Sequence, residues 1–248
     1  MRTFIDLSLP IRATPSEATP VVISALDHHE APRVLGLEPR DFPDGMAISN
    51  EQIALTTHTG THMDAPFHYG PLSGGYPARK IADIPLAWCY GRGVRLDVRH
   101  RRPGEEISAT DIMEAEEQTG TVVSPLDIVL TWTGCDRLWG NEKYLTDYPG
   151  LGRDAVAYLV KQGVRIIGID AWGLDRPMAS MLRDYRSTGN RSYLWPAHLY
   201  GREQEYCQLE KLANLHLLPF SYGFHVICFP VSIEEAGAAW TRVVAVFE

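Results

Sequence analysis

The stretch Arg153-Asp-Ala-Val-Ala-Tyr-Leu-Val-Lys-Gln-Gly-Val-Arg-Ile-Ile-Gly-Ile-Asp170 joins two elements of different kind. A helix is predicted from about Arg153 to Gln162, because Gly163 follows it as a C-terminal stop. The next segment, Val164–Asp170, is almost entirely apolar and ends in a carboxylate, as expected of a buried strand. A helix that leads directly into a buried strand indicates a fold that mixes both element types.

Strand-like segments outnumber helical ones in the rest of the chain, and they occur in consecutive groups. This pattern predicts the α/β (α+β) class, with a large mixed and partly antiparallel sheet. The 248 residues contain no repeat, low-complexity tract or linker, so one domain is expected over residues 1–248. The predicted strands cover residues 3–9, 53–57, 93–98, 127–132, 224–231 and 241–247, and another helix runs from about Ser108 to Gly120.

Residues 10–50 form a long connection that is rich in proline and charge and has weak periodicity. Connections of this length inside a compact domain are often lids or binding segments. We therefore expect an N-terminal arm over residues 10–50 that covers the active site or reaches a partner subunit.

Composition excludes several classes of function. The formal net charge is −8, which argues against general nucleic-acid binding. No apolar run approaches the roughly 20 residues of a membrane helix, and the N-terminus has no signal-peptide core. The four cysteines are scattered and form no CxxC pair, so reduced thiols and a cytoplasmic location are expected.

The strongest chemical signal is His58-Thr-Gly-Thr-His-Met-Asp-Ala-Pro-Phe-His68. Imidazole nitrogens and a carboxylate oxygen suit a divalent metal such as zinc or manganese. A set made of His58, His62 and Asp64 leaves coordination positions open, as catalysis requires. His68 then remains free to move protons. A polar loop with solvated histidines is the alternative, but so many ligand-type residues in one short segment favour a metal site.

Two further clusters carry candidate residues. His198, followed by Glu203, Glu205 and Glu210, offers an additional imidazole and carboxylates for a second metal. The alternative there is a charged helix face. The segment Asp170–Asp175 places carboxylates after an apolar strand, and for these a structural role in turns or caps is favoured.

Aromatic residues are candidates for a substrate pocket. Trp88, Trp172 and Trp195 are predicted to line a site for a flat aromatic small molecule. The alternative for tryptophans is core packing, and for most aromatic residues of the chain it is the favoured role.

The pattern HxGTHxDxPxH at His58–His68 resembles the signature of the putative cyclase family, which includes bacterial kynurenine formamidase, isatin hydrolase and cyclases of aromatic polyketide antibiotics. Similarity to that family extends over nearly the whole chain. It includes the segments 4–10, 128–134, 168–175 and 210–215.

This resemblance implies a swivelling β/β/α domain that binds one or two divalent ions, zinc or manganese. The first ion would be held by His58, His62 and Asp64. The second would be held by Asp64, His198 and Glu210. His68 corresponds to the usual proton shuttle, and Glu210 is predicted to be catalytic as well as a ligand. Family members are generally dimers or larger, so a homodimer or homotetramer is expected.

Three functions follow from these observations. The segments around Trp88 and Trp195 look most like the polyketide-associated branch of the family. Metal-dependent cyclisation of an aromatic or polyketide-type carbonyl substrate is therefore the first hypothesis. Metal-dependent hydrolysis of an amide or lactam is the alternative, because it uses the same polarised carbonyl. A non-catalytic metal-binding protein is disfavoured by the open coordination of the first site.

Overall fold

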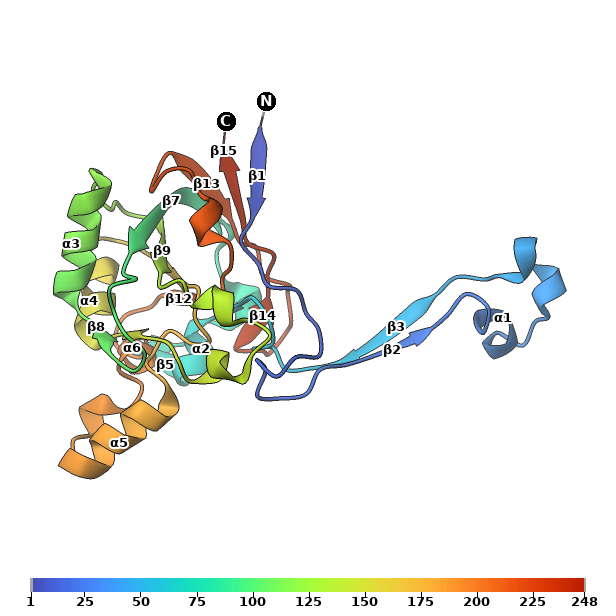
Figure 1. Cartoon of the computed structure of the whole chain (residues 1–248), viewed down its shortest axis with the longest axis horizontal. Coiled ribbons are helices and arrows are strands. Elements are labelled where there is room, and N and C mark those ends of the chain that lie inside the picture. The colour runs from blue at the N-terminus through green and yellow to red at the C-terminus, as the bar shows by residue number, and fades with distance from the viewer. Residues whose placement is uncertain (1, 248) are drawn as a thin grey trace.

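A nine-stranded mixed sheet forms the centre of the computed structural model, which describes residues 2–247 (Figure 1). Four neighbouring strands in its middle run parallel, and the strands on both sides pair antiparallel. The predicted fold class is thereby confirmed. In spatial order the strands are β1 (Thr3–Asp6), β15 (Val244–Phe247), β13 (Phe224–Ile227), β7 (Tyr90–Asp97), β9 (Ile128–Trp132), β11 (Ile166–Ile169), β12 (Cys207–Glu210), β4 (His62–Asp64) and β14 (Ala238–Trp240).

Two helices that run parallel to each other, α3 (Ala109–Thr119) and α4 (Arg153–Lys161), lie beside the parallel strands (Figure 1). Ser108 begins α3, because its hydroxyl accepts a hydrogen bond from the Asp111 amide while the Asp111 carboxylate accepts one from the Ser108 amide. Gly120 ends α3 with a φ of 72°, a conformation that glycine adopts without strain.

Both faces of the central strands are buried. Successive strand residues point to opposite faces, so Val129 packs with the apolar side of α3 and α4, whereas Ile128 and Leu130 pack with the second core. The second core includes Met63 of β4 and Leu209 of β12, the two strands that carry candidate ligands. Burial on both faces explains why these strands read as apolar runs without alternation.

The remaining elements are short, except for α5 (Met178–Thr188), which has 11 residues like α3. They are α1 (Ala31–Val34), α2 (Pro66–Tyr69), α5, α6 (Pro196–Tyr200), the antiparallel pair β5 (Leu72–Ser73) and β6 (Tyr76–Pro77), and the parallel pair β8 (Glu106–Ile107) and β10 (Gly150–Leu151).

A hairpin projects far from this body (Figure 1). Its strands, β2 (Val22–Leu26) and β3 (Asn50–Ala54), pair antiparallel, and α1 lies near its tip. We call residues 22–54 the hairpin arm. The weak periodicity of residues 10–50 thus hides regular structure. Strand β3 ends at Ala54, whereas the sequence predicts a strand from residue 53 to 57.

Several elements differ from the sequence prediction. Strands β4, β12 and β14 and helix α5 are additional to those predicted. Glu210 lies at the end of β12, so the interpretation of its surroundings as a charged helix face is wrong. Strands of three or four residues that are buried on both faces offer no alternation from which to predict them.

Two expectations about the chain as a whole can be compared with the structure. Among the helices within residues 2–247, none is long and apolar enough to cross a membrane. All four cysteines are buried and free, consistent with reduced thiols.

Candidate metal centre

The pairing of β4 with β12 brings three candidate ligands together, namely His62, Asp64 and Glu210. His62 and Asp64 are two residues apart on β4, so their side chains share one face of the sheet. Glu210 of β12 lies directly opposite His62 in the antiparallel register, which places its side chain on that same face. His62 Nε2 lies 3.5 Å from Glu210 Oε2 and 3.4 Å from Asp64 Oδ1.

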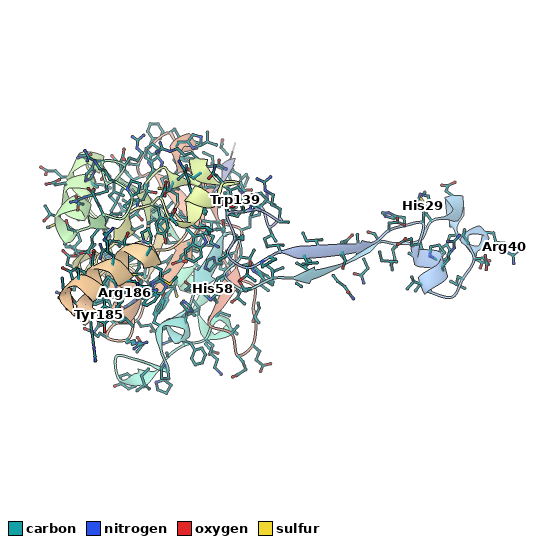
Figure 2. The ribbon with its side chains drawn as sticks, turned by 60° about the horizontal axis from the view of Figure 1, so that its bottom comes forward. His29, Arg40, His58, Trp139, Tyr185 and Arg186 are labelled. Carbon is teal, nitrogen blue, oxygen red and sulfur yellow. The ribbon has the colours of Figure 1, made fainter. Side chains whose placement is uncertain are left out.

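His58 approaches from the turn before β4, where the hairpin arm meets the body (Figure 2). Gly60 has a φ of 62° and lets the chain reverse between His58 and the strand. His58 Nδ1 then lies 3.2 Å from His62 Nε2 and 3.0 Å from Asp64 Oδ1. The turn therefore delivers a second imidazole to the carboxylate.

Asp64 is fully buried, and neither of its carboxylate oxygens has a hydrogen-bond partner among the described residues. Burial opposes its charge, but the attraction of His62 and the other imidazoles keeps its pKa below the ordinary value. A buried carboxylate without hydrogen bonds is costly unless another group compensates it. A cation held by Asp64 and the surrounding imidazoles supplies that compensation, so the residues fit a divalent metal.

The donor atoms form two groups that share Asp64. One group contains His58, Asp64 and His68, and the other contains His62, Asp64 and Glu210. Within each group the ligand atoms lie within 4.8 Å of one another. A shared carboxylate agrees with the expected bridging role of Asp64, whereas the division of the histidines differs from the predicted one.

His198 reaches the centre from α6. Its Nδ1 lies 2.5 Å from Asp175 Oδ2, and its Nε2 lies 3.8 Å from Glu210 Oε1. Burial opposes the charge of His198, but the Asp175 hydrogen bond outweighs it and raises the pKa to about 9. A carboxylate on one imidazole nitrogen is the usual means of orienting the other nitrogen toward a metal.

Asp175 contacts the candidate ligand His198, although its sequence context did not place it in the site. It accepts hydrogen bonds from the amides of Ala197 and His198, so it also caps the first turn of α6. The predicted structural role is thus correct but incomplete. The remaining carboxylate of that segment, Asp170, accepts hydrogen bonds from the Thr133 amide and hydroxyl and from the Gly134 amide, and joins two strand ends.

Glu210 is held in place by the Leu174 amide, which donates to its Oε1 at 2.8 Å. Burial and the nearby charge of Asp64 raise its pKa above the ordinary value. Because the carboxylates of Glu210 and Asp64 lie close together, their charges favour the binding of a cation.

Loss of contact with water disfavours the charged form of two imidazoles, the buried His62 and the partly exposed His68. Burial lowers the pKa of His62 to about 3 and that of His68 to about 4. His62 Nδ1 lies 2.8 Å from the Gly60 carbonyl, which fixes the proton there and leaves the Nε2 lone pair facing Asp64. His68 is more accessible, and its Nε2 lies 4.0 Å from Asp64 Oδ2.

The predicted tryptophans are spread over different surroundings. Trp172 lies 5.3 Å beneath the ammonium of Lys211, the residue after Glu210, which places it close to the centre. Trp88 packs against the second core, with the guanidinium of Arg79 over its ring. Trp195 is partly exposed at the start of α6. Substrate binding by these residues stays a prediction.

Two cavities lie outside the histidine cluster. The larger, of about 840 Å³, is lined by residues of α4 and α6 such as Arg153 and Tyr200. The other, of about 450 Å³, is lined by residues of β1 and β14 and their surroundings. None of the candidate ligands lines either cavity, so the chemistry is assigned from the donor geometry.

Comparisons with known proteins show which family the chain resembles. The model of the family described as "Putative cyclase" matches residues 5–176. A kynurenine formamidase of Sphingopyxis alaskensis is 32% identical over 139 residues, which cover 56% of this chain and 59% of that protein. A kynurenine formamidase of Geobacillus thermodenitrificans is 30% identical over 191 residues and 75% of each chain.

Solved structures show the same fold. An isatin hydrolase bound to the product analogue thioisatinate superposes with a TM-score of 0.76 and 22% identity, covering 99% of this chain and 92% of that one. Isatin hydrolase A of Ralstonia solanacearum gives a TM-score of 0.75 at 21% identity, covering 100% and 92%. With the family model matching residues 5–176, the chain belongs to the putative cyclase family and is an enzyme of that family.

Proposed function

We propose that the protein is a metal-dependent hydrolase that cleaves an amide or lactam bond next to an aromatic ring. The observation that carries the proposal is Asp64, a buried carboxylate without hydrogen bonds at the centre of imidazole and carboxylate donors. The named activities of the relatives, formamide and isatin hydrolysis, support this class of substrate.

In this proposal His58, His62, Asp64, His198 and Glu210 hold one or two divalent ions, zinc or manganese. A bound ion of this kind lowers the pKa of water and polarises a carbonyl oxygen. The chain's own contribution is to fix the donors. Glu210 is held by the Leu174 amide and His198 by Asp175, so the donors need little rearrangement on binding.

His68 is the proposed proton-transfer residue. Its side chain is 32% exposed, more than those of His62 and Asp64, so it can reach both the centre and a substrate. Because its imidazole is neutral, it can accept a proton from the attacking water. As the carbon–oxygen bond forms and the carbon–nitrogen bond breaks, the same proton passes to the leaving nitrogen.

Hydrolysis is favoured here over the polyketide-type cyclisation that the sequence analysis placed first. The kynurenine formamidase and isatin hydrolase names among the relatives are those of hydrolases. Both chemistries begin with the same polarised carbonyl, so the donor set serves either.

Turnover of two substrate types tests the proposal. The full chain, loaded with zinc or manganese, is assayed for formate release from an N-formyl aromatic amine and for ring opening of isatin. We expect hydrolysis of at least one, abolished by a chelator and restored by the metal. Failure of the metal-loaded protein to hydrolyse either substrate would overturn the proposal.

We also propose that the protein self-associates through the hairpin arm. A two-stranded hairpin without further support is marginally stable in water, and this one carries many exposed apolar side chains. A second copy related by a two-fold axis covers both arms at once and closes the assembly. The exposed apolar residues of the arm are Val22, Ile23, Val34, Leu35, Leu37, Met46, Ile48 and Ile53.

A further inference from the structure

A buried ion pair lies directly behind the turn that carries His58. Lys211 Nζ lies 2.6 Å from Glu17 Oε2, and the two side chains are only 3% and 5% exposed. Lys211 follows Glu210 at the end of β12, whereas Glu17 comes from the segment that leads into the hairpin arm. Charges are rarely buried to this extent unless they are paired.

Both members of the pair bind the backbone of the same turn. Lys211 Nζ donates to the His58 carbonyl at 2.8 Å, and Glu17 Oε1 accepts from the Gly60 amide at 2.7 Å. The Thr61 hydroxyl donates to the Lys211 carbonyl at 2.5 Å. Side chain and main chain of one lysine thus fix both ends of the turn between His58 and His62.

This anchoring matters for His58 in particular. His62 and Asp64 lie on a strand and are held by its ladder, but His58 lies in a turn and its side chain is 37% exposed. Its position therefore depends on how its backbone is tied down. Lys211 itself has a φ of 58°, an unfavourable conformation for a lysine that the surrounding contacts must maintain.

The segment that carries Glu17 is fixed on its other side as well. The Ser16 hydroxyl donates to the Asn141 carbonyl and accepts from the Gly140 amide, at 2.9 and 2.8 Å. The hairpin arm begins a few residues later, at Val22. The same short segment therefore contacts the turn between His58 and His62 and forms the root of the hairpin arm.

We propose that Glu17 and Lys211 are positioning residues of the metal centre, which hold the His58–Thr61 turn in its ligating conformation and tie it to the root of the hairpin arm. The inference rests on the metal centre of the proposed function. Neither residue is a ligand or touches the reacting atoms; each acts through the backbone of the turn.

The charges of the pair add a second expectation. The Lys211 ammonium lies close to a centre that binds a cation, and Glu17 neutralises it. Removing the Glu17 charge leaves an ammonium next to that cation, whereas removing Lys211 leaves a carboxylate. We therefore expect Glu17→Gln to weaken metal binding at least as strongly as Lys211→Met.

The test is the affinity of the full-length chain for Zn²⁺, measured by competition with a chromophoric chelator. Lys211→Met and Glu17→Gln are expected to bind Zn²⁺ about 10–100-fold more weakly than wild type, the usual effect of losing an outer-shell partner. The matched control is Arg101→Met, which removes one charged partner of the buried Asp111 carboxylate near the N-terminus of α3 and leaves the centre untouched. Its affinity should stay within about twofold of wild type.

The double variant Glu17→Gln/Lys211→Met separates positioning from mere stability. With neither charge left unpaired, the melting temperature of the metal-free protein should recover relative to the single variants. Its Zn²⁺ affinity should remain reduced, because the His58 carbonyl still lacks its donor. Faster amide hydrogen exchange at Gly60 in this variant would support the same conclusion.

Each other result overturns the inference. Unchanged Zn²⁺ affinity in the folded single variants, full recovery of affinity in the double variant, or an equal loss in Arg101→Met would each show that the pair does not position the turn. A wild-type chain that binds no Zn²⁺ would instead refute the metal centre itself, and with it the proposed function.

Discussion

The candidate metal centre depends most on one carboxylate, that of Asp64. It is fully buried, it has no hydrogen-bond partner within residues 2–247, and His58 and His62 nitrogens surround it. The imidazoles offset the cost of burying this carboxylate in the metal-free protein, and a bound cation would take over that role.

Asp64→Asn is therefore expected to abolish metal binding and turnover and to lower the melting temperature of the metal-free protein. The amide keeps the size of the side chain but loses the attraction of the imidazoles, which holds the pKa of Asp64 below its ordinary value. Calorimetry with a chelator present, combined with metal analysis of the folded variant, checks both parts. A folded variant that binds as much metal as wild type would contradict the role of Asp64 as a ligand.

His68→Gln separates a ligand from a proton-transfer residue. The geometry groups His68 with His58 and Asp64, whereas its accessibility suits proton transfer. We expect metal affinity within about twofold of wild type and kcat lower by about 10²–10⁴-fold. Loss of the metal would instead assign His68 as a ligand, and normal turnover would exclude both roles.

Asp175→Asn tests the orientation of His198. The amide has only one accepting oxygen, so it cannot replace both carboxylate oxygens, one of which faces the Ala197 amide and the other the His198 amide and Nδ1. It therefore no longer fixes the proton on Nδ1 as the carboxylate does. Metal affinity is expected to fall about 10–100-fold while the helix content is unchanged. Circular dichroism and a chelator competition measure the two quantities, and unchanged affinity would remove Asp175 from the site.

Local sequence patterns predict several elements, whereas no local pattern predicts which distant strands pair. The His58–His68 segment was identifiable because its residues are close in sequence, and α3, α4 and β11 were predicted from local patterns. Glu210 and His198 are brought in by sheet register and by the capping of α6, which no local pattern contains. For these two residues the sequence offered candidates with a charged helix face as the alternative, and the family resemblance then favoured them as ligands.

The start of α3 provides an element-level prediction with a pH dependence. Asp111 is buried and accepts hydrogen bonds from Arg101, His100 and Ser108. Burial opposes its charge, but these hydrogen bonds hold its pKa below the ordinary value of 3.8.

A lowered pKa means that the carboxylate stabilises the folded state above pH 3.8, and that this contribution is lost as the pH falls further. Asp111→Asn should therefore reduce the free energy of unfolding by about 2 kcal/mol at pH 7, with a difference that shrinks in acid. Urea unfolding of both proteins across this range tests it. A constant difference at all pH values would contradict the assignment.

In the whole molecule, the strands of the hairpin arm are the feature that the sequence predicts least well. A segment rich in proline and charge gave no periodicity, because both strands of the arm are exposed in one chain and the tip buries only a few residues, such as Ala31 and Pro32.

Ile48→Asp tests self-association through this arm. Ile48 is 81% exposed in the single chain, so the substitution should leave the fold intact but place a charge in the proposed interface. We expect wild type to sediment as a dimer or larger species and the variant to dissociate at least 10-fold more readily. Val122→Asp, exposed on the body after α3, serves as the control. A monomeric wild type would refute the assembly.

Anomalous X-ray diffraction shows whether a divalent ion occupies the donors around Asp64. Crystals of the full chain grown with Zn²⁺ or Mn²⁺, with data collected at the absorption edge, would locate the ion. We expect one or two anomalous peaks in contact with Asp64 and the imidazoles of His58 and His62. Crystals without a peak at Asp64, from protein saturated with the metal, would refute the metal centre.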